Sequence, residues 1–589
     1  MAVPPIQAAG LASLGRVNRL PLVLDVIVGL LAVVALPLAI VAVPNTISVV
    51  SALLPPDIAG VWILRAHGLA LPVMLCTVPL AAAVLRRVPA APMLVTGLAC
   101  LAVADVAGGF AGSTLGVGAL RALHGIGAGV LVPATLAAVG ERPGASRNVL
   151  LPVWAGALAV GLLAAQALAL WPLDEVTSWR VTLQPYPLLT GVALALAAVH
   201  FTLSRLSREP GREGGTLARE IAETTESAET AAATVAAGSP TASGTAESAA
   251  QASGSRKPVD RGHLALAAGP SAGIAVLAVG TTFDWPSGLI MVAAAIGVVT
   301  LLAMAYLGRV EGPGGRLIAF VMVAVGLVVL PTAAQVTYVE LGGLGGPGLS
   351  GLWIPFGLAA LIALAAASVA ARLSAGLVPK LVGGGLVAMV VGLCAVRLLV
   401  PSPSGMPLVV PFVLLTAGAA VAVTSAVRCA GYRAALFGLS LCFPAVLSGF
   451  LLGTGIQVGW LRAVSMSGKV TSEAMVEGFV GALHIWALAA GFTVVIVLIL
   501  GAVLVRRSYD SAPPDTVEYA EPRHSAPSDV KVAPREATGP ASPPAPAAEP
   551  ADGASSAADS GTAAPPVVPP PTRSPEGATG EDGDGAAAR

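Results

Sequence analysis

Five ionisable side chains lie inside apolar stretches of about twenty residues in the first quarter of the sequence: Arg65, His67, Asp105, Arg121 and His124. A stretch of this length can cross a bilayer as a helix, and a charge near its centre costs at least ~2.5–3.5 kcal/mol. Each group therefore needs a partner or a water-filled cavity. Counted along the helix rise, Asp105 and Arg121 lie at similar depth in consecutive antiparallel segments. We expect these two residues to form a charge pair, with Arg65 as a second cation nearby.

Two interpretations of this cluster are open. In the first, Asp105 is a protonatable carrier controlled by Arg121 and Arg65, His124 relays protons, and His67 is a further candidate for that role. In the second, the cluster is a static ion pair that locks three helices together. Two cations around one acid favour its ionised form, which opposes proton cycling at neutral pH. An anionic group on a substrate could instead supply the missing negative charge.

Other polar residues inside the apolar stretches are sparse. Gln335, Tyr338 and Gln166 are candidates for lining a substrate cavity. Three ionisable residues are expected to be structural: Glu340, solvated at the outer end of its segment, His484, a satisfied packing residue, and Asp25, within reach of water near the cytoplasmic face.

The elements that must position these side chains are fourteen apolar segments, each long enough to span hydrocarbon ~30 Å thick. With 56% hydrophobic and 11% charged residues and a mean hydropathy of +0.84, the chain is not a soluble globular protein. The segments form a group of six, a polar interruption, a pair and a second group of six. Their ranges are 20–43, 60–83, 92–113, 115–139, 149–171, 183–204, 262–282, 287–307, 316–340, 350–371, 377–399, 406–427, 433–455 and 479–505.

Several classes of function are disfavoured. The net charge is zero and no basic patch with interleaved aromatics occurs, so no nucleic-acid partner is expected. No phosphate-binding glycine motif and no nucleophile with a base stands out, so neither ATP use nor an enzyme activity is expected. Metal ions and cofactors are not expected either, because the five cysteines show no paired spacing: Cys76, Cys100, Cys394, Cys429 and Cys442.

Basic residues predict the orientation, because Lys and Arg near helix ends stay on the cytoplasmic side. With residue 1 in the cytoplasm, 21 basic residues flank the cytoplasmic ends of the segments and four lie outside (Arg180, Arg397, Arg462 and Lys469). Both termini are then cytoplasmic. The predicted regions are a cytoplasmic N-terminus (1–19), a six-helix bundle (20–204), a disordered cytoplasmic linker (205–261), two accessory transmembrane helices (262–307), a second six-helix bundle (316–505) and a disordered tail (508–589).

The tail contains 16 prolines and 13 acidic against five basic residues, a composition typical of disorder. It is either a solvated extension or a segment that docks a cytoplasmic protein partner through its extended Pro-rich parts.

Local motifs resemble those of the fourteen-helix drug:proton antiporter branch of the major facilitator superfamily, which shares the six, two, six layout. Residues 121–128 with Val132 and Pro133 resemble the family's RxxQGxGaa…P signature, with His124 in place of the Gln. Further matches are Trp62, the WR…P stretch of Trp179, Arg180 and Pro187, and the segment containing Pro331, Gln335 and 349–352. The resemblance implies an all-α polytopic membrane protein with two six-helix bundles and two inserted central helices.

Three other family signatures are degenerate. The loop after the second helix keeps Arg86 but has Leu85 where the family has an Asp, and the loop after the tenth keeps Arg372 and Lys380 but has Ala371. The family's GxxxGPxxGG motif is replaced at 161–166 by Gly-Leu-Leu-Ala-Ala-Gln, and Pro37 stands near the place of the first-helix acid. In the family, the GxxxGPxxGG motif is associated with antiport, and the loop acid anchors an inter-helix charge network that stabilises one state of the transport cycle.

We therefore expect a multi-pass transporter of the cytoplasmic (inner) membrane. It would export a small amphipathic or hydrophobic molecule, with Asp105 as coupling acid, Arg121 as its partner and Gln335 as a substrate contact. Its partners would be the substrate, protons and the lipid bilayer, and its Ala- and Gly-rich composition suggests a bacterial source. The alternative is a transporter-derived scaffold or sensor that no longer transports and acts through 205–261 and 508–589.

Overall fold

The computed structural model describes residues 20–42, 50, 53–54, 60–171, 178–207, 257–280, 285–308, 314–341, 346–466 and 471–510. Within these ranges the regular secondary structure is helical throughout. Thirteen of the described helical segments are long and apolar enough to cross a membrane. The prediction of an all-helical, multi-pass membrane protein is confirmed for this part of the chain. The predictions for 1–19, for 208–256 of the linker and for 511–589 of the tail lie outside it.

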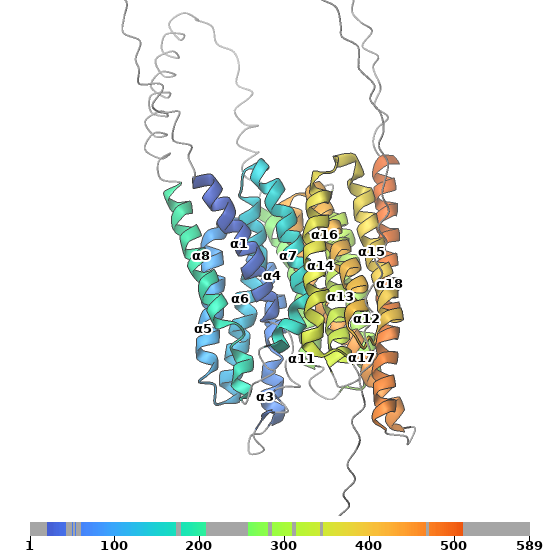
Figure 1. The fold of residues 1–589 in the computed structure, drawn as a ribbon. Coiled ribbons are helices and arrows are strands. Elements are labelled where there is room, and N and C mark those ends of the chain that lie inside the picture. The colour runs from blue at the N-terminus through green and yellow to red at the C-terminus, as the bar shows by residue number, and fades with distance from the viewer. Residues whose placement is uncertain are drawn as a thin grey trace, which may run out of the picture. The chain divides into compact units, whose positions relative to one another are not determined.

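Figure 1 shows the described helices, which fall into three groups along the chain. The first group is α1 (Leu20–Val41), α3 (Gly60–His67), α4 (Ala70–Val84), α5 (Ala90–Gly108), α6 (Thr114–Gly140), α7 (Gly144–Leu170), the 3-10 helix η3 (Trp179–Leu183) and α8 (Pro187–Leu206). Two helices follow, α11 (Lys257–Gly280) and α12 (Ser287–Leu307). The last group is α13 (Gly315–Leu341), α14 (Gly348–Arg372), η5 (Ala375–Leu377), α15 (Val378–Leu399), η6 (Met406–Leu408), α16 (Val409–Ala430), α17 (Tyr432–Met466) and α18 (Ser472–Asp510).

Several predicted segments differ from the helices; for example, α5 ends at Gly108, five residues before the predicted end, and α7 begins at Gly144, five residues before the predicted start. The predicted span 262–282 corresponds to α11, which begins five residues earlier and ends two residues earlier than predicted. The predicted span 60–83 is broken between α3 and α4, where the amides of Gly68 and Leu69 bond three residues back. Helices α17 and α18 are longer than predicted, at 35 and 39 residues.

The helix contacts repeat between the first and last groups. We count α3 and α4 together as the second helix of the first group and leave out the 3-10 helices. In each group the first helix then packs on the fourth, fifth and sixth; in the last group, for example, α13 contacts α16, α17 and α18. The second helix packs on the fourth, and the third on the fourth and sixth. Between the groups, the second helix of each contacts the fifth of the other, as α4 with α17 and α14 with α7. We call these two groups the first and second halves.

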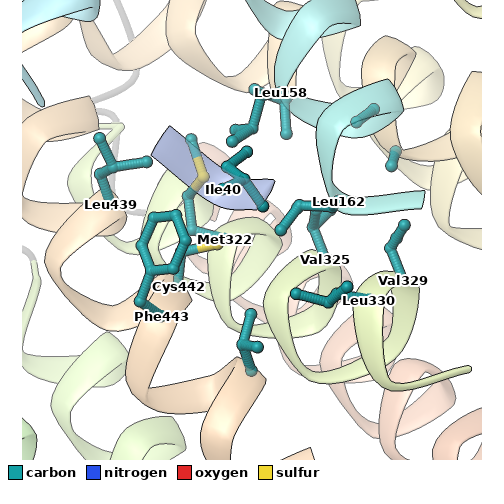
Figure 2. Close-up of a cluster of buried hydrophobic side chains, with 14 of the residues drawn as sticks. Ile40, Leu158, Leu162, Met322, Val325, Val329, Leu330, Leu439, Cys442 and Phe443 are labelled. Atoms are coloured by element: carbon teal, nitrogen blue, oxygen red, sulfur yellow. The ribbon is translucent and has the colours of Figure 1, made fainter. Parts of the chain in front are cut away.

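Helix α13 occupies the interior, where it contacts α7, α16, α17 and α18. Its sequence is apolar all round, which is typical of a helix with no water-facing side. Ile40 of α1, Leu158 and Leu162 of α7, and apolar residues of α13 and α17 fill the space where the halves meet (Figure 2). The large exposed apolar side chains lie on the outer helices, for example Phe492 on α18 and Leu188 on α8, as expected for surfaces that face lipid.

Candidate functional site

Asp105 is the centre of a buried polar cluster in the first half. Its side chain is on α5 and the residue is only 2% exposed. The hydroxyl of Thr190, on α8, donates to Asp105 Oδ2 at 2.8 Å, and His124 Nε2, on α6, lies 3.1 Å from Oδ1. The side-chain amide of Gln184 donates to the backbone carbonyl of Asp105 at 2.9 Å. One carboxylate thus connects three helices of the first half.

The second nitrogen of His124 decides how many protons this pair holds. Nδ1 lies 2.9 Å from the carbonyl oxygen of Leu120, and because a carbonyl only accepts hydrogen bonds, Nδ1 carries a proton. The contact between Nε2 and Asp105 then requires one more proton, placed either on the carboxyl group or on the imidazole. Asp105 and His124 therefore share a single proton in this arrangement.

Arg121 has a different role from the one predicted. Its Nε donates to the carbonyl of His67 at 2.9 Å, and its Nη1 donates to the carbonyl of Ala42 at 3.1 Å. These carbonyls end α3 and follow α1, so the guanidinium ties the ends of two helices together. The prediction of an Asp105–Arg121 ion pair is wrong, because the structure pairs Asp105 with His124.

The reason is the direction of the side chain around the helix. Residues 121 and 124 are three positions apart, so their side chains diverge by about 60° around α6 and are ~4.5 Å apart along it. The depth estimate used only the position along the helix axis. It placed Arg121 near the correct level but could not show that His124 faces α5.

The remaining members of the predicted cluster lie on α3, and neither is a described partner of the Asp105 side chain. The guanidinium of Arg65 lies over the ring of Trp62, with Cζ 4.9 Å from its centroid. His67 is 1% exposed and meets Trp179 edge to face, with 6.4 Å between ring centroids. Neither ring nitrogen of His67 has a hydrogen-bond partner among the described residues. His67 therefore packs as a neutral ring, although its carbonyl anchors Arg121.

Two glycines of the segment 121–128 on α6, which resembles the RxxQGxGaa…P signature, explain how α6 reaches its neighbours. A Cβ atom on Gly125 would collide with the backbone of Ala70 on α4, and one on Gly127 would lie 2.8 Å from the carbonyl oxygen of Gly97 on α5. Only residues without side chains allow backbones to approach this closely. The close packing of α6 on α5 brings His124 within hydrogen-bonding distance of Asp105.

Two of the three predicted cavity residues meet between the halves. Gln166 on α7 donates from Nε2 to the hydroxyl of Tyr338 on α13 at 3.1 Å. Gln335, one turn earlier on α13, lies instead against Gly453 of α17. Gln166 and Tyr338 therefore make a polar contact between the halves, while Gln335 lies in the packing of the second half.

The space between the halves is apolar at its centre and polar at one end. Met322, Val325 and Phe443 are among the side chains that fill the centre (Figure 2). A cavity of about 240 Å³ lies at the end that the basic residues predict to be cytoplasmic, between α6 and α7 of one half and α16 and α17 of the other. Its polar lining includes Arg147 and Arg428.

Sequence reasoning missed several polar contacts. The Asp25 side chain is 25% exposed and so stays within reach of water, as predicted, but it also accepts hydrogen bonds from Arg142 Nε and Ser146 Oγ, each at 2.6 Å. Glu340 is 1% exposed, and its Oε1 accepts from the backbone amide of Ser402 at 3.0 Å, so the expectation of a solvated Glu340 is wrong.

These partners are 62 to 121 residues away along the chain, and no local pattern points to them. Thr190 carries the clearest signal that was overlooked, because it is a hydroxyl just inside an apolar helix. Among the described residues no group of three His, Cys, Asp or Glu side chains could hold a metal ion.

No protein-family model and no curated protein sequence matches this chain. Among solved structures, a peptide transporter in complex with sulfate matches with 14% identity over 83% of this chain and 95% of its own, at a TM-score of 0.45. A bacterial homologue of the human lysosomal transporter Spinster matches with 14% identity over 84% and 98%, at 0.46. A proton:xylose symporter of the major facilitator superfamily matches with 13% identity over 84% and 96%, at 0.45. These similarities are too low to assign a fold family.

Proposed function

We propose that this chain is a proton-coupled membrane transporter of the major facilitator type that moves small hydrophobic or amphipathic molecules. The observation that carries the proposal is the buried Asp105–His124 pair with its single shared proton. Protonatable groups that face the interior of a helix bundle are typical of proton pathways in transporters. The motif resemblance and the repeated helix contacts of the two halves support the same assignment.

Release of the shared proton would change the packing of the first half. Without it, the lone pair of His124 Nε2 would face the charged Oδ1 of Asp105, and the contact would become repulsive. The carboxylate also binds Thr190, so the change would act on α5, α6 and α8 together. Proton occupancy would therefore favour one arrangement of these helices over another, which is the requirement for coupling.

The contact between the halves favours an apolar substrate. Its centre is filled by aliphatic and aromatic side chains, and its described polar bridge is the bond between Gln166 and Tyr338. If the halves rock apart, the surface exposed there would be apolar with a few hydrogen-bonding groups, as in sites for drug-sized ligands. Breaking one hydrogen bond and separating apolar surfaces costs less than separating buried ion pairs.

Ethidium is a suitable amphipathic probe for the transport test. Inside-out membrane vesicles with an imposed proton gradient should accumulate it when they contain the parent chain. The Asp105→Asn variant should lose the gradient-dependent part of the accumulation. Unchanged accumulation in this variant would remove Asp105 from the mechanism.

A second measurement needs no substrate. Hydrogen exchange of the α5 and α6 segments, corrected for intrinsic rates, should depend on pH in the parent and much less in Asp105→Asn. Equal pH dependence in both proteins would show that the pair does not control the packing of these helices.

The alternative function, a scaffold or sensor, depends on the linker and the tail, most of which lie outside the described residues. Deletion of residues 511–589 separates the two proposals. A transporter should keep ethidium transport, whereas a scaffold should lose its partner binding.

A further inference from the structure

A second site lies on the outer surface of the second half, at the ends of α13, α15 and α18. A groove of about 470 Å³ is formed there, and most of its lining is aliphatic or aromatic, including Leu317, Phe320, Leu386 and Val497. None of these residues belongs to the Asp105 cluster or to the contact between the halves.

Two basic residues lie at the rim of the groove, Lys380 near the start of α15 and Arg506 near the end of α18. Both side chains are exposed. They lie at the end of the helices that the distribution of Lys and Arg predicts to be cytoplasmic. The groove thus combines an apolar interior with a cationic edge.

Two glycines, which have no side chains to fill the space, contribute to the groove. Gly383 on α15 and Gly501 on α18 both line the groove. A Cβ atom on Gly383 would meet no heavy atom within 4 Å, and one on Gly501 would meet only Leu317 Cδ1, at 3.9 Å. The space beside these glycines is therefore open to a ligand and is not filled by the protein.

The surroundings indicate which ligand fits. Along α15 and α18 the surface beyond the groove continues with exposed apolar side chains, including Val387, Val391, Phe492 and Ile499. Such a surface faces lipid in a membrane protein. The groove then opens into the acyl-chain region, while Lys380 and Arg506 lie near the headgroups of the cytoplasmic leaflet, where anionic lipids are concentrated.

We propose that this groove binds one anionic phospholipid, with an acyl chain against the glycine-lined wall and the phosphate between Lys380 and Arg506. The charge complementarity selects an anionic headgroup over a zwitterionic one. The groove is separate from the proton-sharing pair, so this site stands independently of the proposed transport function.

Native mass spectrometry of the purified full-length chain tests the proposal, with phosphatidylglycerol and phosphatidylcholine as probes. The parent should retain one phosphatidylglycerol more tightly than phosphatidylcholine. The Lys380→Gln/Arg506→Gln variant should bind phosphatidylglycerol at least about tenfold more weakly. The matched control is Arg372→Gln/Arg433→Gln. It removes two exposed basic residues, one at the end of α14 and one at the start of α17, on the side that is predicted to be cytoplasmic, and it should bind phosphatidylglycerol as the parent does.

A steric test leaves the charges unchanged. Gly383→Leu places a side chain into the open groove and should abolish retention of phosphatidylglycerol. Gly384→Leu is the control, because this neighbouring glycine also has open space around it and does not line the groove. Melting temperatures near that of the parent would show that both variants are folded.

Three results would overturn the proposal: no preference of the parent for phosphatidylglycerol, equal losses in both charge-removal variants, or parent-like retention in Gly383→Leu.

Discussion

His124 Nε2 lies 3.1 Å from Asp105 Oδ1, and this contact joins α6 to α5 inside the first half. Because His124 Nδ1 already donates its proton to the carbonyl oxygen of Leu120, the attraction between Nε2 and Asp105 Oδ1 depends on one further proton. A static ion pair between His124 and Asp105 and a proton-carrying pair would share this geometry. They differ in whether the shared proton leaves the pair during transport.

Replacement of His124 by Gln separates the proton-carrying interpretation from the static one. A glutamine amide can still donate to Asp105, so the helices stay joined, but it cannot hold the shared proton. We expect gradient-driven ethidium accumulation to fall by at least about tenfold, since positioned proton transfer typically contributes 10²- to 10⁴-fold. His484→Gln is the control, because that imidazole contacts only the carbonyl of Val400 among its described partners, outside the cluster. Parent-like accumulation and pH profile in His124→Gln would favour the static interpretation.

Thr190→Val should weaken the cluster from the side of α8. The variant keeps the shape of the residue but removes the hydroxyl that donates to Asp105 Oδ2 at 2.8 Å. A buried carboxylate oxygen without its donor costs about 1–3 kcal/mol. Thermal unfolding in detergent should show a lower melting temperature, and Thr190→Ser should restore it. If Val and Ser behave alike, the hydroxyl does not stabilise the carboxylate.

Gly125→Ala should disturb the packing of α6 on α4. The added methyl carbon would collide with the Ala70 carbonyl and lie 2.9 Å from Val73 Cβ, so the two helices must separate. Overpacking of this kind costs typically about 1–3 kcal/mol. Gly118→Ala, on the same helix, is the matched control, because its nearest atom would be Leu69 Cδ1 at an ordinary 3.5 Å. Equal melting temperatures for the two variants would contradict the close approach at Gly125.

Tyr338→Phe and Gln166→Leu should each weaken the bond between α7 and α13. Polar bonds between membrane helices average about 0.6 kcal/mol in double-mutant cycles. The two substitutions remove the same 3.1 Å bond, so their effects on the free energy of unfolding should not add. A double variant whose loss equals the sum of the single losses would show that the bond is not a coupled pair.

The helices could be predicted from the sequence because membrane spans are defined by local apolar length. The segment 287–307 coincides with α12, and the segment 316–340 differs from α13 by one residue at each end. The membership of the polar cluster was also partly predictable, since Asp105 and His124 are conspicuous in apolar helices. Their pairing was not, because it depends on the rotation of α6, which distant contacts such as that of Gly125 with α4 determine.

Glu340 also has a partner that is distant along the chain and that the sequence does not indicate. Its Oε1 accepts from the amide of Ser402, which precedes η6 in the segment after α15, so the carboxylate holds this segment against the end of α13. Glu340→Gln keeps an oxygen acceptor for that amide, whereas Glu340→Ala leaves a buried N–H unpaired, at a cost of about 1–3 kcal/mol. Hydrogen exchange of residues 400–408 should therefore accelerate in the Ala variant and stay near the parent rate in the Gln variant. The exposed Glu473 provides the control, because its replacement by Ala should leave this segment unchanged. If the Gln variant exchanges as fast as the Ala variant, the charge of Glu340 and not its acceptor oxygen holds the segment.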